Sequence, residues 1–566
     1  MRNFRILIYI LTATLSAGCE KDTINKSESN EITITEDPSD YVWNSSSAIP
    51  INFDGTTITV ASSNVSVNGN KATIKAAGEY IITGTLTDGQ LLVSTTNKGT
   101  VKLILNGVSM TSFSSAPIFI ADAEKAVIIL ADNSVNTITD ASKYIFASGE
   151  DEPNAAVFSK SDLIIYGYGE LFVNGNYNDA ISSKDGLIIK NTKINTEAVD
   201  DGIRGKDYML IYDSSIKISA KGDGLKSDNE SNTSAGFINI KSSEINISSG
   251  GDGISAIKNV DIEDGNLSII TGGGSSYTAS SNSSTKGIKA GKTVTINCET
   301  LQINTAEDAL HSDDYICINS GEISISASDD GIHAENKIDI NDGSISISNS
   351  YEGIESTLIT INGGNIHVLS SDDGINGAGG ATISTQYGNV SSGNMLINGG
   401  YIAVTAAGDG IDINGSITMN GGTVIVHGPT NSGNSAIDYD GSFKITGGNL
   451  IAAGSSGMAQ APGTSSTQNA LLLNLSSVQQ AGTILCIQKS DGTTVACFKP
   501  IKDYQSIAMS SVLLESGSTY NIYLGGSSTG TLIDGVYEGG NYTWGTKYTS
   551  FSVSGVVTKI GNTGRP

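Results

Sequence analysis

Alternation of aliphatic and polar residues dominates the chain. Between residues 337 and 348, isoleucine alternates with polar residues, and Asn341-Asp342-Gly343 interrupts the alternation. A hydrophobic period of two predicts strands, and the Asn-Asp-Gly interruption predicts a turn between two of them. No helical period accompanies the pattern, so we expect an all-β protein of short strands.

A three-residue motif, an acid followed by Gly or Ala and then by Ile or Leu, recurs along the chain. Successive acids are 22, 22, 29, 56, 22, 22, 21 and 36 residues apart, and Lys286-Gly287-Ile288 divides the gap of 56 with Lys in place of the acid. The acids are Asp179, Asp201, Asp223, Asp252, Asp308, Asp330, Glu352, Asp373 and Asp409. Insertions between intact repeats are typical of a solenoid.

Each repeat of about 22 residues has room for three short strands, which predicts a parallel β-helix with one repeat per coil. A leucine-rich solenoid is excluded because its Leu frame and helical half are missing. Equivalent residues would stack at about 4.8 Å. The aliphatic residue of the motif would then form an internal ladder: Ile181, Ile203, Leu225, Ile254, Ile288, Leu310, Ile332, Ile354, Ile375 and Ile411.

Changes in the repeat pattern and in residue composition divide the chain into four segments. Residues 46–464 carry the repeat, with a looser period before residue 175, and are assigned to the β-helix. Residues 465–566 have hairpin-like strands with more aromatic residues, which predicts a small antiparallel β cap. Residues 20–45 are expected to be a tether, and residues 1–19 an export signal.

The export signal begins with Arg2 and Arg5, continues with an apolar run at residues 6–11 and ends in small residues. Residues 15–19 resemble a lipobox in which Cys19 would be lipidated, although Ser16 replaces the usual Leu or Val. The alternative is a simple cleaved signal. No later stretch is long and apolar enough to span a bilayer, so the lipid would be the anchor of an exported, cell-surface protein.

The charge composition of the chain makes nucleic acid an unfavourable partner. The chain has 58 acidic and 32 basic side chains and a net charge of −26. Nucleic acid is disfavoured because phosphate binding needs clustered Lys and Arg. Only 16% of the residues are charged and 38% are hydrophobic, which argues against a disordered chain.

Cys486 and Cys497 flank an Asp-Gly turn and would lie opposite each other; the sequence leaves open whether they are bonded.

The acids of the motif would stack in one column, and a second acid precedes several of them, as at Asp200, Asp329 and Asp372. Two carboxylates 5 Å apart repel by roughly 3 kcal/mol at an effective dielectric of 20. Ca²⁺ would neutralise them, because it accepts six to eight oxygen ligands in flexible geometry. The alternative is that each carboxylate caps the next backbone amide of its turn.

Basic residues repeat beside the acids. Lys184 and Lys206 are 22 residues apart, as are Arg204 and Lys226. Cations next to a calcium-binding column suit a polyanionic sugar such as polygalacturonate, through Arg–carboxylate contacts and bridging calcium. The alternative is a charge ladder that stabilises the stack.

Two smaller groups could also recognise a ligand. His311 and His333 are one repeat apart and could bind a transition metal, although a solvated polar ladder is the simpler interpretation. Tyr542, Trp544 and Tyr548 could stack on sugar rings, although packing within the cap is the simpler interpretation for them.

Four segments, at residues 154–160, 173–185, 200–207 and 222–228, resemble the bacterial carbohydrate-binding domain family typified by a clostridial cell-surface protein. The resemblance covers roughly residues 50–560. It implies a right-handed parallel β-helix similar to polysaccharide lyases, binding of cellulose and acidic polysaccharides, bound calcium and no demonstrated cleavage. Among the acids in these segments, the candidate calcium ligands are Asp179, Asp200, Asp201 and Asp223.

The leading hypothesis is a non-catalytic, calcium-assisted, monomeric polysaccharide-binding protein at the bacterial surface. Its candidate ligand-binding residues are Lys184, Arg204, Lys206 and Lys226. One alternative is a calcium-dependent lyase, in which Arg204, Lys206 or Lys226 removes the proton next to a uronate carboxyl. Another is a structural adhesin or spacer without a soluble glycan ligand.

Overall fold

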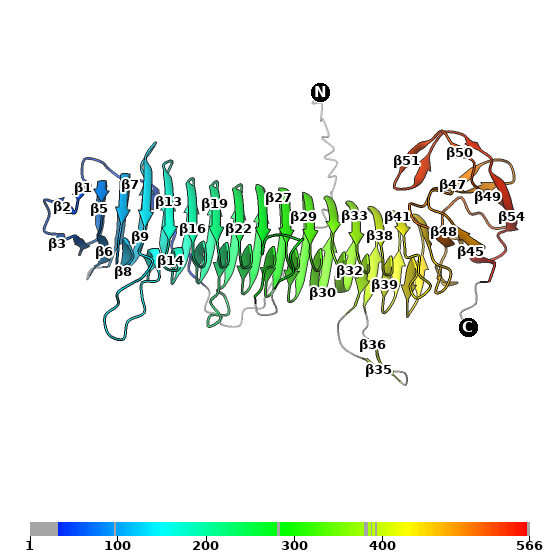
Figure 1. Ribbon diagram of the computed structural model, residues 1–566, viewed down its shortest axis with the longest axis horizontal. Coiled ribbons are helices and arrows are strands. Elements are labelled where there is room, and N and C mark those ends of the chain that lie inside the picture. Colours follow the sequence, from blue (N-terminus) through cyan, green and yellow to red (C-terminus); the bar gives the residue numbers. More distant parts are fainter. Residues whose placement is uncertain are drawn as a thin grey trace, which may run out of the picture.

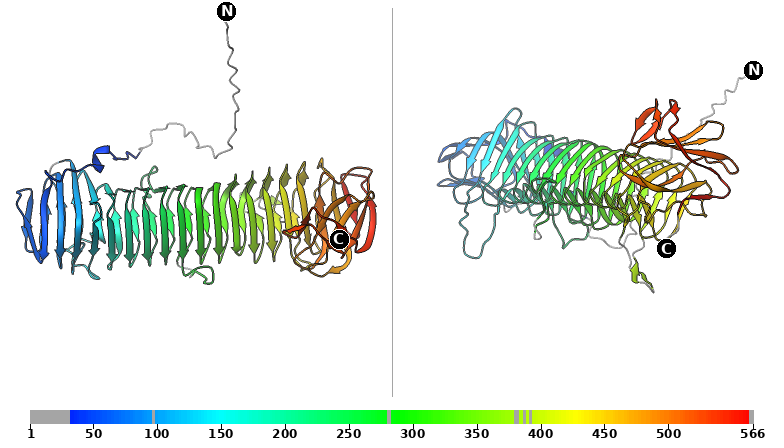
Figure 2. Two further views of the ribbon diagram at one scale, coloured as in Figure 1. Left: turned by 90° about the horizontal axis from the view of Figure 1, so that it is seen from above. Right: turned by 45° about the vertical axis from the view of Figure 1, so that its right-hand side comes forward.

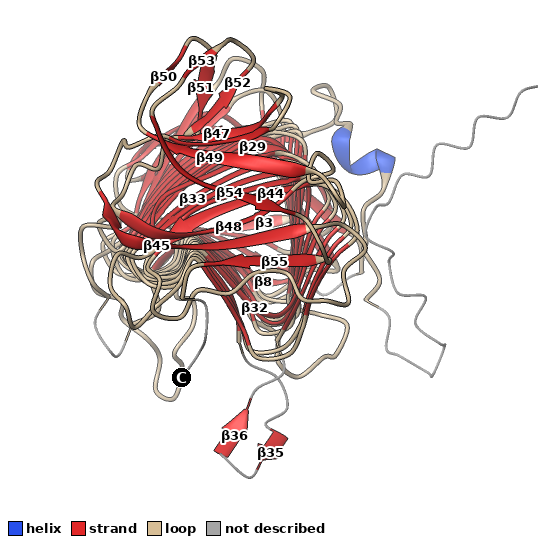
Figure 3. Cartoon of the chain, turned by 90° about the vertical axis from the view of Figure 1, so that its right-hand side faces the viewer, coloured by secondary structure: helices blue, strands red, loops and turns tan. Residues whose placement is uncertain are grey.

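Stacked coils of short parallel strands form most of the computed structural model, which describes residues 32–95, 98–279, 283–378, 383–385, 388–390 and 393–562. Each coil contributes to three parallel stacks, and the body is an elongated, β-helix-like solenoid (Figure 1). Seen from its end, the solenoid presents its strands on distinct sides around a filled interior (Figure 3). The expected all-β class with parallel strands is confirmed.

The first stack carries the repeated motif. Its strands are β4 (Lys71–Ile74), β6 (Gln90–Ser94), β8 (Ile118–Asp122), β11 (Ala155–Ser159), β14 (Asp179–Ser183), β17 (Ile203–Gly205), β20 (Leu225–Ser227), β23 (Ile254–Ala256), β26 (Ile288–Ala290), β28 (Leu310–Ser312), β34 (Ile375–Gly377), β39 (Ile411–Ile413) and β42 (Ile437–Tyr439). The beginnings of β30 (Ile332–Ile340) and β32 (Ile354–Ile361) complete the first stack, and their ends belong to the second.

The second stack follows in each coil. Its strands are β9 (Lys125–Leu130), β12 (Leu163–Tyr166), β15 (Gly186–Lys190), β18 (Tyr208–Tyr212), β21 (Phe237–Lys241), β24 (Asn259–Glu263), β37 (Asn394–Ile397), β40 (Ile417–Met419) and β43 (Phe443–Ile445). Five longer strands run through the second and third stacks: β1 (Ile49–Gly55), β5 (Gly78–Leu86), β7 (Thr100–Thr111), β27 (Thr293–Thr305) and β29 (Tyr315–Ala327).

The third stack closes each coil. Its strands are β10 (Val135–Thr139), β13 (Glu170–Gly175), β16 (Lys193–Ala198), β19 (Ser215–Ala220), β22 (Glu244–Ser249), β25 (Asn266–Thr271), β31 (Ser344–Asn349), β33 (Asn365–Ser370), β38 (Tyr401–Ala406), β41 (Thr423–His427) and β44 (Asn449–Gly454). At the N-terminal end, β2 (Thr57–Val60) and β3 (Val65–Asn68) form hairpins with β1 and β4. A further hairpin, β35 (Ile383–Thr385) and β36 (Gly388–Val390), projects from the solenoid (Figure 1).

The predicted aliphatic ladder is confirmed. Ile181 pairs with Ile203, Ile203 with Leu225, and the pairing continues through each motif to Ile411. No member of the ladder exposes more than 2% of its surface. Tight stacking favours a residue without a side chain at Gly202, because a Cβ there would lie 2.7 Å from the carbonyl oxygen of Gly224.

The first described residues pack along the outside of the second stack (Figure 2, left). They include a single-turn 3-10 helix, η1 (Pro38–Tyr41), and Tyr41 and Trp43 contact an apolar cluster on the outer faces of β9, β12, β15 and β18. The buried Lys125 ammonium lies 2.6 Å from Asp40. Part of the segment expected to be a tether, residues 32–43, therefore covers one side of the solenoid.

An antiparallel region closes the C-terminal end. β48 (Tyr504–Ser510) pairs antiparallel with β44 and with β45 (Ala470–Gln479), and β55 (Val557–Ile560) pairs with β45, so the last coil has no open edge in the third stack. A six-stranded sheet lies beyond, in orange and red in Figure 1. Its strands, in sheet order, are β51 (Thr531–Ile533), β52 (Val536–Glu538), β47 (Thr494–Phe498), β46 (Leu485–Lys489), β49 (Thr519–Leu524) and β54 (Thr546–Ser552). We call this six-stranded sheet the cap sheet.

The structure shows the state of the cysteine pair near the C-terminal end but does not describe the predicted export signal. Cys486 of β46 and Cys497 of β47 face each other and form a disulfide, which settles the question that the sequence left open. The predicted export signal and Cys19 lie outside the described residues. Within the described residues, no helix has the length and apolar character needed to cross a bilayer.

Candidate functional site

The repeated acids form a regular column along one edge of the first stack, which we call the acid ladder (Asp179, Asp201, Asp223, Asp252, Asp308, Asp330, Glu352, Asp373 and Asp409). In each of the first coils, one carboxylate oxygen accepts a hydrogen bond from the backbone of the next coil. The amide of Asp201 donates to Asp179 Oδ1 (3.3 Å), and that of Asp223 to Asp201 Oδ1 (2.9 Å). Capping of amides is therefore real, but the capped amide lies one coil away and not in the same turn.

Three of the four predicted calcium ligands converge at the start of the ladder. Asp179, Asp200 and Asp201 each offer one oxygen, and these oxygens lie within 4.8 Å of one another. Asp179 is 1% exposed, and its Oδ2 is buried without a hydrogen-bond partner. The fourth predicted ligand, Asp223, lies one coil further on and pairs with Lys226 at 2.9 Å. The trio therefore contains an unsatisfied carboxylate oxygen, a costly arrangement without a cation.

Burial and mutual repulsion change the titration of this trio. Burial, reinforced by the charge of Asp201, raises the pKa of Asp179 to about 8. Burial also raises the pKa of Asp201 to about 6, although Lys226 opposes the change. Without a metal ion, the site holds a proton on Asp179 near neutral pH, and a cation would have to displace that proton.

This shift predicts how stability depends on pH in the metal-free protein. Unfolding releases the proton of Asp179 at any pH between about 3.9 and the folded value, so stability should fall as the pH rises from about 4 to about 8, by at most about 1.4 kcal/mol per pH unit. Asp179→Asn should reduce this slope, measured by thermal unfolding in chelator. The exposed Asp54→Asn is the control. If Asp179→Asn keeps the full slope, Asp179 does not carry the shifted pKa.

The outward-facing residues of the first stack form a second column, three positions after the acid ladder, which we call the central row. Its members pair in register from coil to coil. In order, they are Arg204, Lys226, Ser255, Lys289, His311, His333, Glu355, Asn376, Asp412 and Asp438. At about 4.8 Å per coil the row is about 43 Å long. Its charge changes from positive near the N-terminal end to negative near the C-terminal end.

The predicted basic residues lie together beside the acid ladder, and three of them have acidic partners. Arg204 makes a two-point contact with Asp228, at 3.1 and 2.7 Å. Lys226 bridges Asp201 (3.2 Å) and Asp223 (2.9 Å). A charge ladder, one of the two interpretations of the sequence, thus exists in the free protein.

The other two basic residues lie in the column next to the central row. Lys184 pairs with Glu152, which also binds Lys160 at 2.8 Å. Lys206 has no acidic partner within 4 Å in the described part of the chain. Sequence reasoning missed Asp228 and Glu152 as partners. The repeat could have revealed Asp228, which stands 22 residues after Lys206 in the same frame, whereas Glu152 lies in a long insertion without such a signal.

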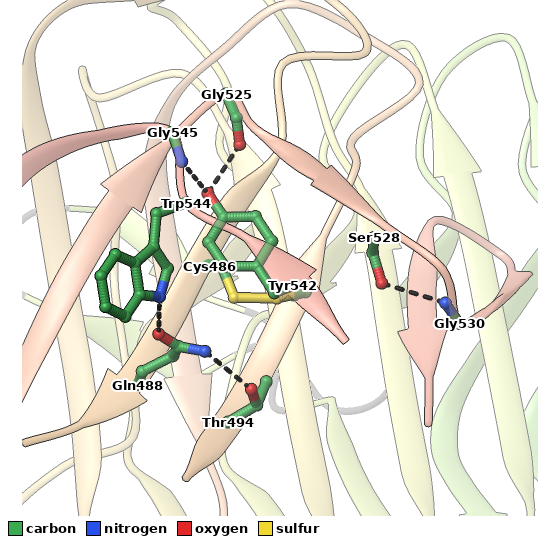
Figure 4. Close-up of a disulfide and its surroundings, with 10 residues drawn as sticks. Cys486, Gln488, Thr494, Gly525, Ser528, Gly530, Tyr542, Trp544 and Gly545 are labelled. Carbon is green, nitrogen blue, oxygen red and sulfur yellow. Dashed lines mark hydrogen bonds between the residues drawn. A yellow bond between two sulfur atoms is a disulfide. The ribbon is translucent and has the colours of Figure 1, made fainter. Parts of the chain in front are cut away.

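Trp544, just before β54, and Tyr523 of β49 form an exposed aromatic platform. Figure 4 shows Trp544 with its hydrogen-bond partner Gln488. Trp544 is 67% exposed, and its ring is nearly parallel to that of Tyr523, with 6.0 Å between centroids. The indole N–H donates to Gln488 Oε1 (2.9 Å), and Gln488 donates to Thr494 (3.0 Å). Tyr542 is fixed separately, by donating to the carbonyl of Gly525 at 2.7 Å. The hydrogen bond to Gln488 orients the indole, while most of its surface stays exposed.

The chain is similar to a protein family, to a bacterial protein and to a solved structure. The model of the carbohydrate-binding domain-containing protein family matches residues 68–331 and 326–374, which include the acid ladder up to Asp373. A carbohydrate-binding domain-containing protein of Acetivibrio thermocellus is 40% identical over 135 residues, 24% of this chain. The match spans 47% of the length of that relative. A solved structure, the gadolinium derivative of a polysaccharide lyase-like protein from C. thermocellum, is 31% identical, with a TM-score of 0.40 over 45% of this chain and 96% of that one.

Proposed function

Because the chain belongs to the carbohydrate-binding domain-containing protein family, we propose that it binds an acidic polysaccharide, such as polygalacturonate, without cleaving it. Calcium assists, and the coils form a right-handed parallel β-helix. The observation that carries the proposal is the position of Arg204 and Lys226 beside an acidic trio whose buried Asp179 Oδ2 has no partner. Cation-binding and anion-binding groups thus lie side by side on one face.

Calcium has two tasks in this proposal. Asp179, Asp200 and Asp201 supply three of the six to eight oxygens that Ca²⁺ requires, and carboxylate groups of the glycan and water supply others. The ion also neutralises the acids that would otherwise repel a uronate chain. Arg204, with its planar two-point geometry, and Lys184, Lys206 and Lys226 contact further uronate carboxylates.

The charge change along the central row limits where the glycan lies. The cationic positions, Arg204, Lys226 and Lys289, occupy the first part of the row. Beyond the histidines, the row holds Glu355 and Asp412 and no cation. Burial together with neighbouring acids raises the pKa of Asp412 to about 7, so its carboxylate repels a polyanion above that pH. A uronate chain is therefore accommodated over the first coils.

Protonation of the basic residues favours binding over lyase chemistry. Although burial disfavours their charged forms, the carboxylates around them raise the pKa of both Arg204 and Lys226 above the ordinary values. A base for β-elimination needs a lowered pKa. These two residues are therefore suited to hold a carboxylate and not to remove a proton.

One experiment separates binding from cleavage. The purified protein is mixed with polygalacturonate and calcium, and both its retention on the polymer and the ultraviolet absorbance of unsaturated uronides are followed. We expect retention without any rise in absorbance. A rise that stops in chelator would make the protein a lyase, and the absence of both signals would favour a structural spacer.

A neutral glucan such as cellulose is a second candidate ligand, supported by the Trp544 platform. An exposed indole, oriented by its hydrogen bond to Gln488, is a surface on which a sugar ring can stack. Trp544→Ala should reduce retention on cellulose about tenfold, equivalent to about 1.4 kcal/mol. Tyr168→Ala is the matched control, because Tyr168 has the same 67% exposure on the coils. Equal loss in both variants, or none in Trp544→Ala, would reject the platform.

We further propose that the protein is exported, lipid-anchored through Cys19 and monomeric at the cell surface. The sequence of residues 1–19 supports export and lipid attachment. Detergent-phase partitioning of the cellular protein should be lost in Cys19→Ala. Partitioning that survives this substitution would contradict the lipid anchor.

A further inference from the structure

Two of the four histidines are adjacent in the central row and take no part in the calcium site described above. His311 of β28 and His333 of β30 are register partners, with ring centroids 5.1 Å apart. Their side chains are 12% and 23% exposed. The other two histidines, His367 and His427, contact Asp534 of the turn between β51 and β52. The pair in the row therefore has a different environment from the remaining histidines.

Carboxylates surround this histidine pair. His311 Nδ1 lies 2.8 Å from Asp308 Oδ2, and His333 Nδ1 lies 3.2 Å from Asp330 Oδ2. On the far side, Glu355 Oε2 lies 3.8 Å from His333 Nδ1. Within each of two overlapping groups, all donor atoms lie within 4.8 Å of one another. The groups are Asp308, His311 and His333, and Asp330, His333 and Glu355.

The charge of this cluster is only partly balanced. Lys286 Nζ lies 2.7 Å from Asp308 Oδ2. Asp330 and Glu355 have no Lys or Arg partner within 4 Å in the described part of the chain. The two carboxylates without a Lys or Arg partner therefore both lie beside His333, which belongs to both groups.

We propose that His311, His333 and the carboxylates beside them bind a divalent transition-metal ion such as Zn²⁺. Two ligands that each lie about 2.1 Å from a tetrahedral ion are about 3.4 Å apart. The nitrogen–oxygen separations of 2.8 Å in the first group and 3.2 Å in the second therefore need to widen only slightly to admit an ion. Two imidazole donors favour zinc-class ions over Ca²⁺, which takes oxygen ligands. Because the row faces outward, such an ion keeps a position open to solvent or to a ligand.

The site also bears on the proposed function. It lies where the row changes from basic to acidic residues, so a bound ion would extend the cationic part of the row towards Glu355. This consequence rests on glycan binding along the row, whereas metal binding itself does not. Failure of the metal site would leave the calcium-assisted binding site near Asp179 unaffected.

The test uses the full chain without a histidine tag. Titration calorimetry with Zn²⁺ is combined with visible absorbance of bound Co²⁺, whose spectrum reports ligand type and geometry. We expect one ion per chain with micromolar or tighter affinity, and Co²⁺ bands in the visible. His311→Gln combined with His333→Gln should weaken binding at least about 100-fold and abolish the bands. His367→Gln removes a partly exposed histidine beside the turn between β51 and β52 and should change neither.

Competition with calcium completes the test. Excess Ca²⁺ should not displace the ion, because imidazole nitrogen is a poor ligand for calcium. The proposal is overturned if the wild-type protein binds no Zn²⁺, if the double variant binds it as tightly, or if excess Ca²⁺ displaces it. Unchanged thermal unfolding of the double variant in chelator would show that its loss of binding is not caused by misfolding.

Discussion

Arg204→Gln combined with Lys226→Gln is expected to lower the affinity for polygalacturonate about 100-fold or more. Each charge-assisted hydrogen bond to a carboxylate contributes about 1.5–3 kcal/mol, and tenfold in affinity corresponds to about 1.4 kcal/mol. The variant also leaves Asp201 and Asp223 without the ammonium that bridges them, which adds repulsion towards a polyanion. Binding isotherms at fixed calcium concentration measure the effect.

The matched control removes the same number of charges from another side of the solenoid. Lys193 of β16 and Lys217 of β19 are exposed on the third stack, and replacing both with Gln should change the affinity no more than a few-fold. If both double variants lose affinity equally, the polymer responds to net charge and not to the central row. If neither loses affinity, the glycan lies elsewhere on the molecule.

Ile332→Ala is expected to destabilise the protein by about 3 kcal/mol, within the range of about 2–5 kcal/mol for truncating a buried aliphatic side chain. Ile332 is 0% exposed and stacks between Leu310 and Ile354 in the ladder. The cavity would lie between coils that depend on their neighbours for burial, so the effect should also spread to those coils. Thermal unfolding and hydrogen exchange measure the global and the local effect.

The control for this substitution is Ile270→Ala. Ile270 lies in β25 and is 43% exposed, so the same truncation should cost less than about 0.5 kcal/mol. Equal destabilisation by the two substitutions would contradict the internal ladder as the main source of cohesion between coils.

The coils could be predicted because their geometry follows from the spacing of about 22 residues between equivalent positions. Each motif places an aliphatic residue inside the coil and an acid at its edge, so a period of 22 residues gives both the ladder and the acid column. The packing of Tyr41 and Trp43 on the second stack was not predicted, because nothing in residues 32–43 repeats. The signal lay instead in the unbroken apolar run of β9, Ala126 to Leu130, which is typical of a strand covered on both faces.

The candidate site could be predicted as columns but not as individual contacts. Spacing placed Asp179, Asp200 and Asp201 near one another, yet it could not distinguish the buried Asp179 from the exposed Asp200. The burial of each acid depends on how far the neighbouring turns extend over it, and insertions in those turns change that extent. Likewise, the repeat of 22 residues locates the basic residues. Glu152, which pairs with Lys184, lies in an insertion that does not follow the repeat.

We propose above all that the first coils recognise the carboxylates of an acidic glycan with the help of calcium. Retention of the protein on polygalacturonate, compared with retention on fully methyl-esterified polygalacturonate in calcium and in chelator, tests it most directly. The two polymers share a backbone and differ in charge. We expect the protein to be retained on the acidic polymer in calcium only and not to be retained on the esterified polymer. Equal retention on both polymers, or retention that chelator does not reduce, would contradict it.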